Sequence, residues 1–238
     1  MKLAISQSNY IPWKGYFDLI ASVDRFVLYD TVQFTKNDWR NRNLIKTHAG
    51  LQWLSIPVGA DIHRTIEQVA LPQTPWRRKH WKSLAAAYGK APYFAEVAAW
   101  LEPLYLHTAD ATLSAFNARL IRAICHYLRI DTEIVADDGR HETDDRVAKL
   151  VHICQRHGAD TYVSAPAGQN YIDARVFQSH GLRLEWFEYP DYPAYAQLHG
   201  AFEHRVSVLD ALFHCGAHPE LFMQHAAGKA MKTSLELV

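Results

Sequence analysis

Short apolar runs bounded by polar turns predict the strands of this chain. They occupy residues 2–6, 25–30, 51–58, 132–136, 161–164 and 182–189. β-Branched and aromatic residues are common in these runs, which is typical of strands buried in a sheet. Apolar residues at helical spacing over 16–23 separate the first two runs, so residues 1–30 predict a βαβ unit with parallel strands.

Helical periodicity dominates residues 76–128, between the third and fourth predicted strands. Leu113, Phe116 and Leu120, for example, fall near one face of a helix. Shorter helices are predicted at 143–157, 173–180 and 208–215. We therefore expect an α/β fold, with a mainly parallel, Rossmann-like sheet flanked by helices and a helical insert around residues 76–128. No repeat or linker interrupts the chain, so residues 1–238 predict a single domain, and its last residues, from 226 on, predict a loosely packed tail.

Composition narrows the class of protein without indicating its chemistry. The 238 residues are 49% hydrophobic, which is enough to bury a core and excludes disorder as the main state. The three cysteines, Cys125, Cys154 and Cys215, form no CxxC pair, so neither a zinc ribbon nor a disulfide scaffold is favoured. The chain shows no signal-peptide pattern and no long uncharged apolar run. We expect a cytoplasmic protein without a membrane span, whose cysteines are reduced.

Net charge is zero, with 25 basic and 25 acidic residues, so a polycation that coats nucleic acid is disfavoured. That neutrality is an average. Residues 36–82 hold nine lysines and arginines against three acids. Basic and aromatic residues alternate there, but no nucleic-acid-binding signature is present. The expected partner is a small anionic molecule rather than a nucleic acid.

Polar residues follow the predicted strands, and in parallel sheets ligands bind beyond the carboxyl ends of strands. After the first strand, a loop that leads into a helix suits phosphate, and its aromatic rings suit stacking on a sugar or base. The substrate-binding residues predicted in this loop are Gln7, Asn9, Tyr10, Trp13 and Gly15. The alternative is that the rings pack the helix onto the sheet.

The segment after the second strand, residues 30–43, is the most informative in the chain. Asp30 ends the strand, and we predict that Asp30 and Lys36 are catalytic. The arginines suit bidentate recognition of carboxylate or phosphate. Predicted substrate-binding residues in this segment are Gln33, Trp39, Arg40, Asn41, Arg42 and Asn43. A solvated basic surface is the alternative.

A third polar cluster follows the strand at 161–164. Ser164, Gly168 and Tyr171 are predicted to contact substrate, because small residues let a ligand approach the backbone; a tight turn is the alternative. Asp144, Asp145 and Arg146 are expected only to cap and flank a helix. The aromatic-polar loop at 189–207 predicts either a lid over the site or an ordered surface loop. The chain has no HExxH motif, and no metal ligands are assigned.

These clusters resemble the WbqC-like family of bacterial proteins over nearly the whole chain. The motifs that carry the resemblance are QSNYIPWKGYFDLI (7–20), FVLYDTVQFTKNDWRNRNLIK (26–46), WLSIPV (53–58), GADTYVSAPAGQNYID (158–173) and FEHRVSVLDALFHCG (202–216). Ser8 departs from the family pattern, which has proline there, and His214 stands where asparagine is common. The resemblance implies an association with O-antigen and other surface-polysaccharide pathways.

The leading functional hypothesis is a small transferase of such a pathway. It would N-acylate or N-aminoacylate a nucleotide-linked amino sugar, with an acyl donor as the second substrate. One alternative is an ATP- and Mg²⁺-dependent ligase or nucleotidyl-transfer enzyme. The order of elements is similar to that of adenylate-forming enzymes of the pantothenate synthetase type, but Trp13–Tyr16 replaces their His-x-Gly-His signature. A non-catalytic module that binds a glycan or an assembly partner is the third hypothesis. The oligomeric state and the identity of the cofactor are left open.

Overall fold

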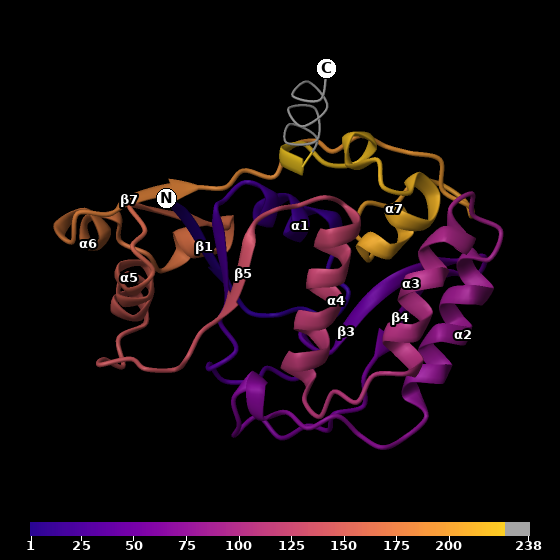
Figure 1. Ribbon diagram of the computed structural model, residues 1–238, viewed down its shortest axis with the longest axis horizontal. Helices are drawn as coiled ribbons and strands as arrows, with labels where there is room; N and C mark the ends of the chain where they lie inside the picture. Colours follow the sequence, from indigo (N-terminus) through magenta and orange to yellow (C-terminus); the bar gives the residue numbers. More distant parts are fainter. Residues whose placement is uncertain (227–238) are drawn as a thin grey trace.

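The computed structural model describes residues 1–226 (Figure 1). Its central element is a five-stranded, all-parallel sheet, which confirms the mainly parallel sheet predicted from the sequence. The strands are β1 (Lys2–Ser6), β2 (Arg25–Leu28), β5 (Glu133–Ala136), β6 (Thr161–Ser164) and β7 (Arg183–Trp186). Beyond Ala226, the tail expected from the sequence lies outside the described residues.

The strand order is β5-β2-β1-β6-β7, so the chain builds the sheet outward from β1 in two directions. Leu3 of β1 pairs with Arg25 of β2 on one side and with Tyr162 of β6 on the other. The connections that leave β1 and β6 therefore diverge at their carboxyl ends. In open parallel sheets this switch point forms a crevice that accepts ligands.

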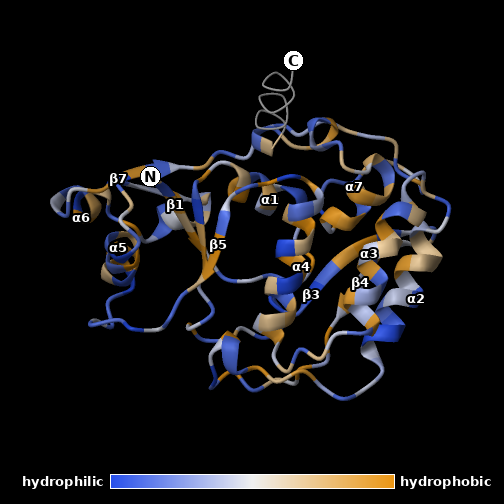
Figure 2. Ribbon diagram, in the orientation of Figure 1, coloured by the Kyte–Doolittle hydropathy of each residue, from blue (hydrophilic) through white to orange (hydrophobic). Residues whose placement is uncertain are grey.

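Helices cover both faces of the sheet. Their bounds are α1 (Lys14–Ala21), α2 (Trp76–Tyr88), α3 (Phe94–Leu106), α4 (Leu113–Tyr127), α5 (Arg146–Arg156), α6 (Ala174–Ser179) and α7 (Val208–Cys215), with short 3₁₀ turns η1 (Ile66–Gln68), η2 (Pro166–Asn170) and η3 (Pro219–Leu221). Alternate strand residues point to opposite faces. Leu3 and Val27 pack against α5 and α6, whereas Ala4 and Phe26 belong to the larger core with α1, α4 and α7. Figure 2 shows hydrophobic residues concentrated in the central strands and in α7.

The predicted strand at 51–58 forms in part, but outside the parallel sheet. β4 (Gly50–Ser55) pairs antiparallel with β3 (Arg42–Thr47), a strand that the sequence does not predict. Most of β4 is exposed, whereas central parallel strands are buried on both faces. β3 is not predicted from the sequence because Arg42 and Asn43, at its start, are polar residues typical of a loop. The hairpin and helices α2–α4 together form the insert between β2 and β5.

Cys125, Cys154 and Cys215 are all buried and free of disulfides. Burial raises the pKa of the Cys154 and Cys215 thiols to about 12, and that of Cys125 also rises. Burial and a raised pKa are typical of structural rather than reactive thiols. In the part of the chain that the structure describes, no helix combines the length and the apolar character needed to span a bilayer.

Candidate functional site

A cavity of about 770 Å³ lies beyond the carboxyl ends of β1, β2 and β6. We call it the sheet-edge cavity. It is lined by Ile5, Ser6, Gln7, Tyr29, Val32, Gln33, Thr35, Asp144, Arg146, Lys149, Leu150, Tyr162, Ser164, Ala165, Ala167, Gly168, Asn170 and Tyr171. Its volume falls in the range of roughly 300–1,000 Å³ typical of small-molecule sites. Because it lies beyond the ends of β1 and β6, the cavity is at the switch point of the sheet, where the topology favours ligand binding.

Two cations from the first turn of α5 line this cavity. The Arg146 guanidinium lies 3.4 Å from the centroid of the Tyr171 ring, and no carboxylate within residues 1–226 pairs with it. Lys149 Nζ lies 3.6 Å from Asp144 Oδ1, but Asp144 is fully exposed, so solvent screens this pair. The Asp145 side chain already accepts the backbone N–H groups of Val147 and Ala148. An anion in the cavity would consequently meet cationic side chains rather than a free helix end.

Tyrosine hydroxyls supply hydrogen-bond donors at this edge of the sheet. Burial and the nearby Asp137 carboxylate raise the pKa of Tyr29 to about 12, so its hydroxyl stays protonated at neutral pH. Burial likewise raises the pKa of Tyr162. His141 packs edge-on against Tyr29, with the ring centroids 5.8 Å apart, and its Nε2 lies 2.9 Å from Asp137 Oδ2. Such a histidine–carboxylate pair is a common arrangement for positioning a proton acceptor, although neither residue lines the cavity.

The turn after β6 lies close to the strand end because residue 168 is glycine. A Cβ at Gly168 would lie 2.2 Å from Ser164 Oγ and 3.0 Å from Ile172 Cδ1. Any larger residue would move the turn that forms one wall of the sheet-edge cavity. Ser164 is itself buried and donates to Ala165 O at 3.2 Å. The predicted residues Ser164, Gly168 and Tyr171 therefore share one wall of the cavity.

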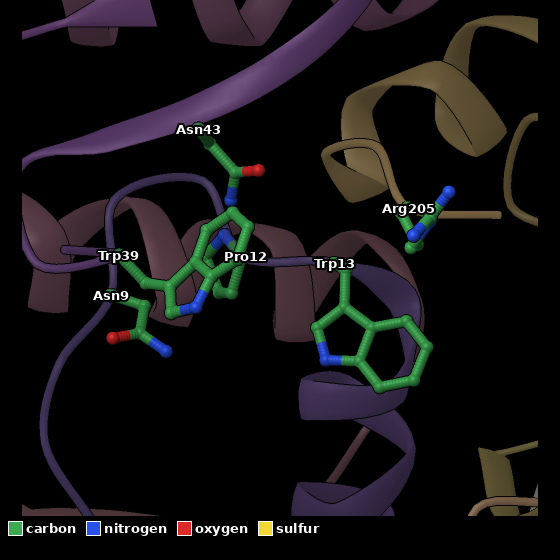
Figure 3. A pocket seen from close by; sticks show the side chains of 6 residues that line it. All are labelled: Asn9, Pro12, Trp13, Trp39, Asn43 and Arg205. Carbon is green, nitrogen blue, oxygen red and sulfur yellow. The ribbon is translucent and has the colours of Figure 1, made fainter. Parts of the chain in front are cut away.

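A second, smaller cavity of about 250 Å³ is formed by the loops after β1 and β2 (Figure 3). We call it the indole cleft. Its lining residues are Asn9, Pro12, Trp13, Trp39, Asn43 and Arg205. The Trp13 ring is held by contacts with Tyr189 and Tyr192, whose centroids lie 4.9 Å and 5.9 Å away. Trp39 is 45% exposed and tilts against Trp53. Four predicted substrate-binding residues thus meet in this cleft.

Hydrogen bonds of Tyr10 and Asn43 fix the loops that form the indole cleft. Tyr10 is fully buried, and its hydroxyl lies 2.7 Å from both His80 Nδ1 and Tyr105 Oη. Asn43 Nδ2 donates to the carbonyls of Tyr10 and Ile11 at 3.1 Å and 2.9 Å. The Tyr10 N–H donates to Trp39 O at 2.9 Å, which joins the two loops. Tyr10 lines neither cavity and acts from within the core.

Asp30 is enclosed between the first loop and α4. It is 4% exposed; Oδ1 accepts the Ser8 N–H at 2.7 Å, and Oδ2 accepts the Ser114 hydroxyl. The Asp30 carbonyl also accepts the Glu67 N–H at 3.0 Å. Asp30 lines neither cavity. This geometry indicates a carboxylate that anchors the first loop to the insert.

The side chains of Arg40, Asn41 and Arg42 interact mainly with other residues of the protein. Arg40 Nη1 donates to Asn9 Oδ1, and its Nη2 lies 3.5 Å from Asp38 Oδ2. Asn41 is buried and donates to Ile56 O at 2.9 Å. The Arg42 guanidinium stacks 4.2 Å from the Trp53 ring centroid. These three residues line neither cavity and instead stiffen the loop that presents Trp39.

The two remaining residues of the second loop differ in position. Gln33 donates from Nε2 to Ile62 O at 3.0 Å and lines the sheet-edge cavity. Lys36 is exposed and lines neither cavity. Lys36 is therefore not brought together with the other predicted site residues.

Gly15 makes room for Trp13 rather than for a ligand. A Cβ at position 15 would lie 2.3 Å from Trp13 Cζ2 and within 2.7 Å of two further ring carbons. The Trp13 indole therefore lies directly over the second residue of α1. This packing fixes the ring that forms one side of the indole cleft.

We expect Gly15→Ala to displace the Trp13 ring. Despite the better helix propensity of alanine, overpacking should lower the free energy of unfolding by about 1–3 kcal/mol. The indole ¹H–¹⁵N resonance of Trp13 should shift in a two-dimensional NMR spectrum, while that of Trp100 on α3 should stay in place. An unmoved Trp13 resonance and unchanged stability would show that the contact does not position the ring.

Several lining residues were not predicted from the sequence. Arg146, Lys149 and Tyr29 line the sheet-edge cavity, and Arg205 lines the indole cleft. A signal for the first two exists, because basic residues three apart at the start of a helix lie on the same face. The expectation that Arg146 only flanks a helix is therefore incomplete. Arg205 lies far along the chain from the first two loops and has no such local signal.

Comparison with known proteins agrees with the sequence motifs. The family model described as the WbqC-like protein family matches residues 7–220. A protein of Mycobacterium tuberculosis (strain ATCC 25618 / H37Rv), named "Uncharacterized protein Rv1507c", is 46% identical over 226 residues, covering 94% of this chain and 98% of its own length. No solved structure matches the chain significantly. Since the match covers most of the chain, the protein belongs to the WbqC-like family.

Proposed function

We propose that the protein is a small transferase that binds a nucleotide-linked amino sugar in the sheet-edge cavity and N-acylates or N-aminoacylates it. One observation carries the proposal: the Arg146 guanidinium lines a cavity at the sheet's switch point and pairs with no carboxylate among residues 1–226. A planar guanidinium matches phosphate oxygens in a bidentate manner. The cavity volume of about 770 Å³ suits a ligand of nucleotide size.

The lining residues have distinct roles in this proposal. Arg146 and Lys149 bind the phosphates, and the tyrosine and amide side chains of the cavity orient the base and sugar. The sugar amine attacks the acyl carbon, a C–N bond forms, the bond from that carbon to the donor's leaving group breaks, and the nitrogen loses a proton. Holding both substrates in one geometry supplies much of the rate gain in such transfers. The reaction would take place in the cytoplasm, in a surface-polysaccharide pathway.

The test is calorimetric binding of nucleotide-linked amino sugars to the wild type and to Arg146→Gln. Because a hydrogen bond to a charged group contributes about 1.5–3 kcal/mol, the variant should bind at least tenfold more weakly. Arg175→Gln is the matched control, because Arg175 is an exposed arginine at the start of α6, paired with Asp173. Equal affinities of Arg146→Gln and Arg175→Gln, or no binding by the wild type, would refute the proposal.

An ATP-dependent ligase would use the same cations for the phosphates of ATP. That candidate predicts Mg²⁺-dependent exchange of pyrophosphate into ATP in the presence of an acid substrate. The transferase proposal predicts no such exchange and instead predicts acyl transfer from an activated donor. A pure binding module would show neither reaction but would still bind ligand in an Arg146-dependent manner.

A further inference from the structure

The free side-chain groups of the indole cleft are mainly hydrogen-bond donors. Asn9 Oδ1 is occupied by Arg40, which leaves the Asn9 Nδ2 group available. The two indole N–H groups, of Trp13 and Trp39, have no hydrogen-bond partner within the described residues. Figure 3 shows the Trp13 indole nitrogen on the side of its ring that faces Trp39, and the Trp39 indole nitrogen on the same side of its ring as the Asn9 amide nitrogen. A ligand in the cleft would have to present acceptor oxygens.

Arg205 adds positive charge to the same cleft. Its Nε lies 3.4 Å from Glu203 Oε1, while its Nη groups have no partner among residues 1–226, and the side chain is 82% exposed. No acidic residue lines the cleft. Asn43 Oδ1, the other side-chain amide oxygen among the lining residues, already accepts the Leu44 N–H at 2.8 Å. Glu203 offsets part of the Arg205 charge, and the two Nη groups of Arg205 remain as charged donors that favour an anionic ligand over a neutral one.

The shape and volume of the indole cleft further limit the class of ligand that fits it. Two indole rings and Pro12 provide apolar walls, and a volume of about 250 Å³ is below the range of roughly 300–1,000 Å³ typical of drug-sized pockets. A single ring fits such a space, whereas a nucleotide does not. A pyranose has apolar C–H faces that pack on aromatic rings and oxygen atoms around its edge.

We propose that the indole cleft binds an acidic pyranose of the hexuronic acid class. The sugar ring packs against Trp13 and Trp39. Its carboxylate accepts hydrogen bonds from Arg205, and Asn9 Nδ2 donates to an oxygen atom at the opposite end of the sugar. This site is separate from the sheet-edge cavity, since the two share no lining residue. The proposal does not depend on the nucleotide-sugar activity described above.

The probe is the methyl glycoside of glucuronic acid, titrated into protein labelled with ¹⁵N at its tryptophan indoles. We expect saturable shifts of the Trp13 and Trp39 resonances, assigned with Trp13→Phe and Trp39→Phe, and no shift of Trp100. The neutral methyl glucoside should bind about tenfold more weakly, because it lacks the charged acceptor. Arg205→Gln, an exposed and structurally mild change, should abolish this preference. Trp100→Phe is the control and should bind like the wild type.

Each result bears on the proposal. Absence of saturable shifts, or shifts confined to tryptophans outside the cleft, would overturn it. Equal affinity for the charged and neutral glycosides would overturn the assignment of an acidic ligand. Arg146→Gln should leave glucuronide binding unchanged, so a failed nucleotide-sugar proposal and a failed cleft proposal give different results.

Discussion

Asp30→Ala is expected to lower the free energy of unfolding by about 3 kcal/mol. The physical reason is that the substitution removes one buried and one part-buried hydrogen bond together. The Ser8 N–H, which is fully buried, loses its acceptor, and the Ser114 hydroxyl loses its partner on α4. Urea unfolding followed by circular dichroism at constant pH measures the change.

Asp30→Asn separates anchoring from catalysis at this position. Its side-chain oxygen can still accept the Ser8 N–H, and its amide can donate to the Ser114 hydroxyl, so we expect a cost of only about 1 kcal/mol. Asp131→Ala, at an exposed position before β5, is the control and should stay within about 0.5 kcal/mol of the wild type. Asp30→Ala as stable as Asp131→Ala would contradict an anchoring role. A stable Asp30→Asn that binds substrates but transfers nothing would support the catalytic role predicted from the sequence.

Acid is expected to destabilise the protein through His80. Burial lowers the pKa of His80 from 6.5 to about 4. The neutral ring fits its surroundings, because Nδ1 accepts from the Tyr10 hydroxyl at 2.7 Å and Nε2–H donates to Ser55 O at 3.2 Å. Between pH 6.5 and 4 the unfolded chain binds a proton that the folded chain does not. The contribution is therefore fully present above pH 6.5 and is lost as the pH falls to about 4, by about 3 kcal/mol.

The comparison of wild type with His80→Gln isolates this effect. Glutamine keeps a donor for Ser55 O but does not titrate, so its stability should depend less on pH in this window. We expect the stability advantage of the wild type to shrink by about 3 kcal/mol between pH 7 and pH 4 in urea unfolding. His180→Gln serves as the matched control because His180 is exposed. Parallel stability curves for the wild type and His80→Gln would exclude His80 as the source.

The hydrophobic pattern was sufficient for the parallel sheet and the helical insert. Strands such as β2 and β6 are short, apolar and bounded by polar turns, so local sequence identifies them. β3 was not predicted from the sequence, because the polar residues Arg42 and Asn43 begin it. Pairing with β4, rather than its own hydrophobic pattern, makes this segment a strand. Strand propensity depends on the neighbouring strand more than helix propensity depends on its surroundings.

The candidate site, like the fold, could be predicted only in part from the sequence. The sequence indicated that polar residues after the strands gather at one edge of the sheet, and Gln7, Gln33 and Tyr171 do line the sheet-edge cavity. It could not show that Tyr10 and Asp30 turn inward, because burial of a polar side chain depends on partners far away in the chain, such as His80 and Ser114.

By itself, the sequence determined the fold class and the position of the insert, and it indicated the loops after β1, β2 and β6 whose residues line the two cavities. Hydrophobic periodicity, turn residues and motifs are local properties of the sequence. They can therefore be recognised without knowledge of tertiary contacts. Only the tertiary structure decided how those loops divide between two cavities, and that Arg146 and Arg205 supply charge to them. The reason is physical: a cavity is formed by residues distant in sequence, and the partners that the fold gives a charged group decide which of its donors can bind a ligand.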